Sequence, residues 1–206
     1  MRRPITLIKP DQQQGYVLFI VLMMMVVIAL LVVTATQSYN TEQRISTNDA
    51  DHKFATTLAE AALREGENRI YEIEDGDFPF TDDCISTSKT KPKDKDKDKD
   101  KDNKQKGLCK AAHVNAGSYL TAEGTITVTG TSKDEAWVRK CGTDKCIEKN
   151  GKEYEISGIK VKPPLHIIEY LGTNSADNRT IYRVTAKAWG KNVNTQVVLQ
   201  SYVASE

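Results

Sequence analysis

The stretch GYVLFIVLMMMVVIALLVV, residues 15–33, decides how this chain is organised. From Tyr16 to Val33 it contains eighteen consecutive apolar residues and no charge. At about 1.5 Å per residue, a helix of this length extends roughly 27 Å, enough to cross the hydrocarbon core of a bilayer. The stretch therefore predicts a transmembrane helix over residues 16–33.

A short polar leader, residues 1–15, precedes the apolar stretch and ends in Gly15. Ordinary secretory signals have a shorter apolar core that is followed by a small-residue cleavage site. Here the apolar run is too long, and Ala35 and Ser38 behind it form a poor site of that kind. The conspicuous small residue lies in front, which predicts cleavage between Gly15 and Tyr16 and retention of the apolar segment. The alternative is a plain signal-anchored protein in which Gly15 has no role.

Charge and length predict the topology. Arg2, Arg3 and Lys9 favour a cytoplasmic leader, because short basic flanks stay on that side of the membrane. The rest of the chain would then be periplasmic, anchored in the inner membrane by a single span. The remaining length suits one globular domain, which we expect over residues 75–206.

The helix is expected to continue beyond the membrane, since residues 16–65 contain neither glycine nor proline. Over residues 34–74 it becomes amphipathic, with Lys53, Glu60, Arg64 and Glu67 opposite a stripe of small and apolar residues. That stripe consists of Ala50, Phe54, Ala55, Leu58, Ala59, Ala62, Gly66, Ile70 and Ile73. It predicts packing against a sheet, and an independent amphipathic helix is the alternative.

Four cysteines follow the membrane segment, a number that fits two disulfides in an oxidising compartment. Four cysteines allow three pairings. Cys141 and Cys146 are close enough in sequence to form a local loop, and Cys84 would then pair with Cys109. Zinc is the competing interpretation, but neither pair has a histidine at ligand spacing.

Residues 89–106 consist almost entirely of Lys and Asp, with a strict dipeptide repeat at their centre. Such a segment has no apolar residue with which to form a core and is expected to be a disordered, solvated insert in the domain. Its interleaved lysines do not suit a calcium site, and its aspartates do not suit a nucleic-acid tail.

Strands are predicted in the second half of the chain. Residues 125–129 alternate in polarity and residues 166–171 are rich in β-formers. Residues 181–189 and 193–203 form the clearest hairpin, with the turn at 190–192. Tyr182, Val184, Ala186 and Ala188 would face one side of the sheet, and Arg183, Thr185 and Lys187 the other. A long helix followed by an antiparallel sheet is an α+β arrangement.

No pattern of residues predicts catalysis, a metal or a cofactor. Ser86 and Lys89 match S-x-x-K only at the start of the charged insert, where no rigid site could form. His52, His113 and His166 are isolated, and each is expected to be a surface or partly packed residue. Trp137 and Trp189 have no basic run beside them, and the net charge of +1 also gives no indication of nucleic-acid binding.

Four parts of the chain resemble the PilX/PilK family of type IV minor pilins, with the nearest likeness to neisserial PilK. The leader and its Gly15-Tyr16 junction are similar to a class III signal. The other three parts are QSYNTEQRIS at 37–46, AEAALREGE at 59–67, and YRVTAKAWG at 182–190 with VVLQS at 197–201.

The resemblance implies a type IV pilin-like fold and a structural role rather than an enzymatic one. It further implies cleavage after Gly15 by prepilin peptidase and N-methylation of Tyr16. Assembly would proceed through the N-terminal helix, on the inner-membrane assembly platform, with other minor pilins and the major pilin as partners.

One residue departs from the pattern of major pilins. They carry a glutamate at the position of Ile20, where it is thought to neutralise the terminal amine of the adjacent subunit nearer the tip. A subunit without that carboxylate suits a place with no neighbour above it, as in GspK-type pseudopilins. We therefore expect a minor pilin that helps to initiate assembly in a priming complex at the tip. The alternatives are an adhesive subunit of the pilus and a minor pseudopilin of type II secretion.

Overall fold

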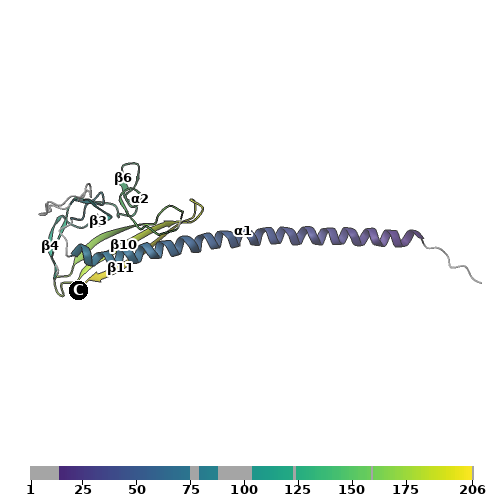
Figure 1. The fold of residues 1–206 in the computed structure, drawn as a ribbon, viewed down its shortest axis with the longest axis horizontal. Coiled ribbons are helices and arrows are strands. Elements are labelled where there is room, and N and C mark those ends of the chain that lie inside the picture. The colour runs from purple at the N-terminus through teal and green to yellow at the C-terminus, as the bar shows by residue number, and fades with distance from the viewer. Residues whose placement is uncertain (1–13, 75–78, 88–103, 123, 159, 206) are drawn as a thin grey trace, which may run out of the picture. The chain divides into compact units, whose positions relative to one another are not determined.

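A single long helix, α1 (Gln14–Glu74), begins the part of the chain that the structure describes. The computed structural model describes residues 14–74, 79–87, 104–122, 124–158 and 160–205. Residues 1–49 and 50–206 form two compact units, and the second is called the head here. The prediction that the helix continues beyond its apolar part is confirmed (Figure 1).

The head is a mixed α+β unit, as the sequence predicts. Its main sheet has the order β11-β10-β9-β3, and β8 pairs with β9. The long strands are antiparallel, but β3 joins β9 in parallel. The long strands are β9 (Leu165–Thr173), β10 (Thr180–Trp189) and β11 (Gln196–Ser205), and β3 and β8 are Leu108–Lys110 and Lys152–Glu153.

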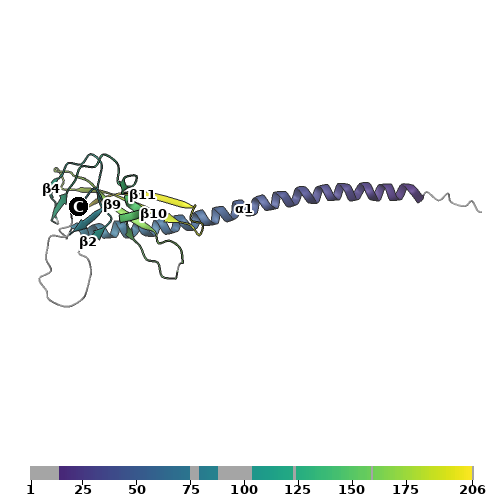
Figure 2. The same cartoon turned by 90° about the horizontal axis from the view of Figure 1, so that it is seen from above.

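The head also contains smaller elements, of which β2 and β4 are labelled in Figure 2. Among the described residues, β1 pairs with β2, β4 with β5, and β6 with β7, each pair as a two-stranded sheet. The bounds are β1 Ile85–Thr87, β2 Lys104–Lys106, β4 Gly117–Leu120, β5 Thr125–Val128, β6 Lys140–Cys141, β7 Asp144–Lys145 and α2 Cys146–Asn150.

The β10–β11 hairpin forms where the sequence predicts it, but its second strand begins at Gln196 instead of Val193. The connection is longer because the Asp51 carboxylate of α1 accepts hydrogen bonds from the backbone N–H groups of Lys191 and Asn192, at 2.6 and 3.3 Å. Val193 consequently lies in the loop and is 63% exposed. One helix residue thus holds the turn of the hairpin.

The predicted stripe of α1 packs on the sheet. Most of its members are buried or half-buried, although Ala50 is exposed. The helix and the sheet are in very close contact at Gly66, where an added Cβ would lie 2.5 Å from Cγ1 of Val184 and 3.2 Å from Cδ2 of His166. Only a residue without a side chain fits at this crossing, which explains why a helix-weakening glycine occupies the middle of the stripe.

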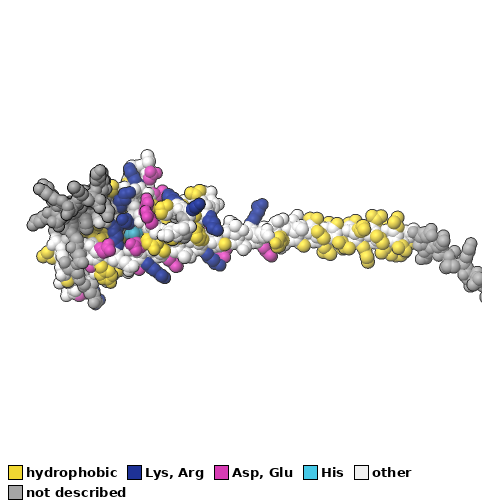
Figure 3. Space-filling view, in the orientation of Figure 1, with side chains coloured by type: hydrophobic (Ala, Val, Ile, Leu, Met, Phe, Trp, Pro, Cys, Tyr) yellow, Lys and Arg dark blue, Asp and Glu magenta, His cyan; other side chains and the backbone are white. Residues whose placement is uncertain are grey.

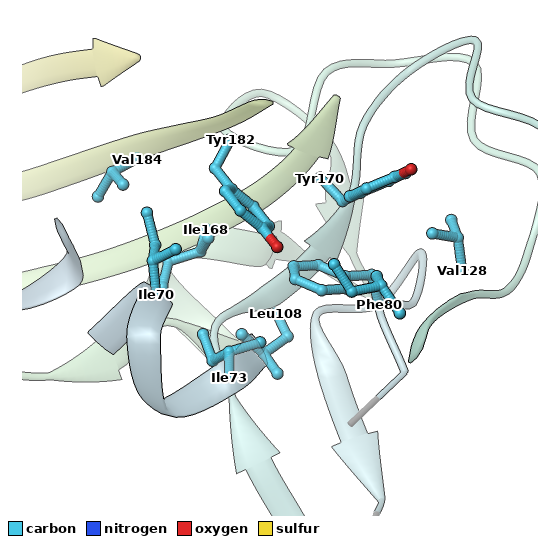
Figure 4. Packing of buried hydrophobic residues seen from close by; sticks show 10 residues of the cluster. Ile70, Ile73, Phe80, Leu108, Val128, Ile168, Tyr170, Tyr182 and Val184 are labelled. Carbon is cyan, nitrogen blue, oxygen red and sulfur yellow. The ribbon is translucent and has the colours of Figure 1, made fainter. Parts of the chain in front are cut away.

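Aromatic rings fill the core at the far end of the stripe (Figure 4). Phe80, just after the helix, has its ring centroid 5.9 Å from that of Tyr170 and 6.1 Å from that of Tyr182. All three side chains are fully buried, together with Ile70 and Ile73 of α1. This cluster joins the end of the helix to β9 and β10.

The prediction of an insert without structure over residues 89–106 is wrong at its end. Residues 88–103 lie outside the described residues, but Lys104–Lys106 form β2 and pair with β1. Arg69 of α1 supports β2, because its Nη1 donates to the Lys106 carbonyl at 2.8 Å and its Nη2 to Oε1 of Gln105 at 2.6 Å. A tertiary contact therefore orders residues whose composition alone predicts a loop.

Candidate functional site

The apolar part of α1 is the candidate functional surface. It is long and apolar enough to cross a membrane. Between Tyr16 and Val33 the large apolar side chains are 38% to 67% exposed, so no described residue covers them. Figure 3 shows hydrophobic side chains spread over this segment. Such a surface is stable only when lipid or other apolar helices surround it.

The predicted cleavage junction lies in the first turn of α1. A Cβ added at Gly15 would meet no atom within 4 Å. A larger side chain therefore fits at Gly15 without disturbing the described chain.

The polar residues that follow Val33 extend the uncharged surface. No charged residue occurs from Tyr16 to Thr41. The hydroxyls of Thr34 and Thr36 donate to the carbonyls of Leu31 and Val33, each at 2.9 Å. Because these hydroxyls already have acceptors within the helix, this part of α1 can be buried against a neighbour at a reduced desolvation cost.

Ile20 lies within this uncharged surface and is its least exposed large apolar residue, at 38%. Its side chain can neither accept a proton nor form an ion pair. The nearest charged residue after it in the sequence is Glu42. This part of the helix consequently offers no carboxylate to the amine of a neighbouring subunit.

The second face of β10, which carries Arg183, Thr185 and Lys187, is buried as well. Glu169 on β9 is fully buried and accepts from Nε and Nη2 of Arg183, at 2.8 and 2.9 Å. Glu169 also accepts from the Ala136 N–H at 3.0 Å, and Glu135 contacts Nη1 of Arg183 at 3.3 Å. The hydrogen bonds that Arg183 donates to Glu169 raise the pKa of its guanidinium above its ordinary value.

The cover of this face comes from residues 134–150, which no pattern in the sequence assigns to it. Lys187 pairs with Glu148 of α2, and Arg139 donates to the carbonyl of Lys110 at 2.7 Å. The signal that could have indicated burial is the acidic residue Glu169, which has Ile167 and Ile168 before it and Tyr170 and Leu171 after it. A buried carboxylate requires a cationic partner.

Two disulfides are present in the head. Cys84 is bonded to Cys109 of β3, 25 residues along the chain. Cys141 is bonded to Cys146, five residues along, at the start of α2. They are the same two pairs that the spacing of the cysteines suggests.

The other residues singled out in the sequence are far from a common site. His52 and His113 are exposed, but His166 is fully buried, which corrects the expectation for that residue. Trp189 is buried, and Nζ of Lys162 lies 3.6 Å from the centroid of its ring. Nε1 of Trp137 donates a hydrogen bond to Glu135. Within the described ranges, no group of three or more His, Cys, Asp or Glu side chains could hold a metal ion.

Ser86 lies in β1 and is buried, whereas Lys89 falls outside the described residues. The S-x-x-K match therefore cannot be placed as a pair.

Stability of the head is expected to fall with acid because of His166. Burial, with Arg69 and Lys152 nearby, lowers the pKa of its imidazole from 6.5 to about 3. Neither ring nitrogen has a hydrogen-bond partner among the described residues. Below pH 6.5 the unfolded chain binds a proton that the folded head excludes, so the free energy of unfolding drops by about 1.4 kcal/mol per pH unit towards pH 3.

Urea unfolding of the detergent-solubilised chain at pH 7 and 4.5, followed by tryptophan fluorescence, tests this expectation. His166→Leu should lose most of the pH dependence, and His52→Gln should keep it. An unchanged slope in His166→Leu would assign the acid sensitivity to other groups.

Comparison with family models gives two matches in chain order. Residues 14–64 match the model described as PilX N-terminal, and residues 91–205 match the one described as Type IV pilus assembly protein PilX C-term. Searches of curated proteins and of solved structures found no match. The likeness to neisserial PilK is therefore not confirmed, but the wider resemblance is. With its long apolar helix and α+β head, this chain belongs to the PilX family of type IV pilus assembly proteins.

Proposed function

We propose that this minor pilin helps to initiate pilus assembly from a position at or next to the pilus tip, in a complex with other minor pilins. The observation that carries the proposal is Ile20 within the uncharged part of α1. A glutamate there would attract the terminal amine of the subunit above, and Ile20 cannot. The isoleucine also avoids the cost of a carboxylate within the membrane.

The route to the pilus follows from the same helix. Prepilin peptidase would cleave between Gly15 and Tyr16, and Tyr16 would become N-methylated. The chain would wait as a single-pass inner-membrane protein with a periplasmic head, and then join the assembly platform, the other minor pilins and the major pilin.

Location in the filament tests the tip proposal. Gold-labelled antibody against the head should mark one end of each pilus in cells that express the chain at its native level. A matched Ile20→Glu variant restores the missing carboxylate and should extend labelling into the shaft. Dense labelling along the shaft by the unaltered chain would contradict the proposal.

Processing is tested by the N-terminal sequence and mass of the mature chain. We expect a start at Tyr16 and a mass heavier by one methyl group. Gly15→Trp should leave the leader attached, because the peptidase would not accept a bulky residue at the junction. Nothing in the described chain resists the larger residue, so the loss of processing would not come from a disturbed helix. Gly15→Ala is the control that should still be processed. A mature chain that begins downstream of Val33 would contradict the retained helix.

A further inference from the structure

Strand β11 forms one edge of the main sheet and is ten residues long. Its register with β10 runs without a break from Gln196 to Ser205. Within the described ranges no strand pairs with its other side. The strand contains no charge and no proline. Native proteins normally protect exposed sheet edges from pairing with other chains by charges, prolines, bulges or short strand length. Strand β11 has none of these features.

Alternation of the hydrogen bonds identifies the backbone groups on the open side. The Gly190 N–H donates to the Thr195 carbonyl at 2.9 Å, which directs Thr195 towards β10. On β9, the Ile168 N–H donates to the Gly107 carbonyl, on the side away from β10. This direction agrees with the same alternation of inward and outward groups in the neighbouring strands. Because antiparallel strands alternate, the even-numbered residues of β11 direct their N–H and C=O groups outwards. They are Gln196, Val198, Gln200, Tyr202 and Ala204.

The side chains beside these groups are apolar and accessible. Val198 is 42% exposed and Tyr202 is 65% exposed on the face of the sheet away from α1. Leu199 and Val203, on the face towards the helix, are half-buried. A strand added to β11 would therefore cover apolar side chains on both faces and satisfy the open row of backbone groups.

We propose that the open edge of β11 binds an extended, uncharged segment of another pilus subunit, which adds to the sheet as a further strand. A row of backbone donors and acceptors recognises extended chain, and alternate side chains give specificity. An uncharged segment fits because β11 offers no charge to pair with a lysine or a carboxylate. The choice of another subunit over a second copy rests on the proposed function, since a tip subunit has few copies of itself nearby.

Photo-crosslinking of the full-length chain in piliated cells tests the contact. Tyr202→p-benzoylphenylalanine is expected to form an adduct with a different pilus subunit, identified by mass spectrometry. Tyr71→p-benzoylphenylalanine is the matched control, because Tyr71 is 69% exposed and belongs to α1 instead of β11. An adduct with a second copy of this chain, or equal yields of the same adduct from both positions, would overturn the proposal.

A proline in β11 distinguishes binding by strand addition from a contact that needs only proximity. Gln200→Pro removes an outward N–H and adds a ring, so the adduct should drop about tenfold or more. Gln200→Ala loses the same bond to Thr185 but keeps the N–H, and should form the adduct normally. An unchanged yield in Gln200→Pro would overturn the proposal.

A second pair of variants covers the case in which Gln200→Pro fails to fold. Val198→Lys should also lose the adduct, whereas Val198→Thr should retain it. Loss of the adduct with intact tip labelling would leave the proposed function standing. Adduct formation in a filament that labels along its whole shaft would refute the tip position and leave the edge contact intact.

Discussion

Leu22→Asp is expected to prevent this subunit from entering a pilus. Leu22 is 56% exposed within the apolar segment of α1, where lipid and neighbouring helices would surround it. An aspartate at the centre of a membrane helix costs about 3 kcal/mol on insertion scales, a factor of roughly a hundred in an equilibrium. A carboxylate would also face apolar helices in the filament, which offer it no partner.

Electron-microscopic pilus counts in a deletion strain that carries each variant measure the effect. Leu22→Met keeps the volume and polarity of the side chain and should restore pili to the normal number. Normal piliation by Leu22→Asp would show that the apolar segment is not the surface by which the subunit assembles.

The second large effect is expected on the stability of the head. Glu169→Gln keeps the shape of the side chain but leaves Arg183, with a side chain only 9% exposed, without its fully buried partner. Removal of one member of a buried ion pair costs about 3 to 5 kcal/mol, because the other charge stays buried. Glu135 cannot compensate fully, since its own side chain is 48% exposed.

Urea unfolding followed by tryptophan fluorescence measures this loss, because Trp137 and Trp189 both belong to the head. Glu60→Gln, on the exposed side of α1, should change the free energy of unfolding by less than about 0.5 kcal/mol. The double variant Glu169→Leu with Arg183→Met should be less destabilised than Glu169→Gln, because no charge remains buried. Equal losses for Glu169→Gln and Glu60→Gln would show that the pair is not needed.

The sequence predicts those parts of the fold whose pattern is local. The continuation of α1, its buried stripe and the β10–β11 hairpin follow from periodicity and from the absence of helix breakers. The apolar surface at residues 16–33 can also be predicted from the local sequence. In each case the residues that decide the structure are neighbours in the chain.

The errors come from contacts between distant residues. The alternation in β10 places Arg183 and Lys187 on one face but cannot show that this face is buried, because the cover comes from residues 134–150, far away in the chain. Residues 104–106 are ordered by Arg69, which precedes them by more than thirty positions. The edge at β11 likewise depends on the order of the strands, which no local pattern gives.

The bond between Cys84 and Cys109 has a mechanical consequence. Tension that entered this subunit through α1 would continue along the backbone into the segment after the helix. At Cys84 the disulfide to Cys109 would transmit this tension directly to β3, and thus to the main sheet. The chain between the two cysteines would therefore bear no tension, and its length could vary without weakening the covalent connection between α1 and the sheet.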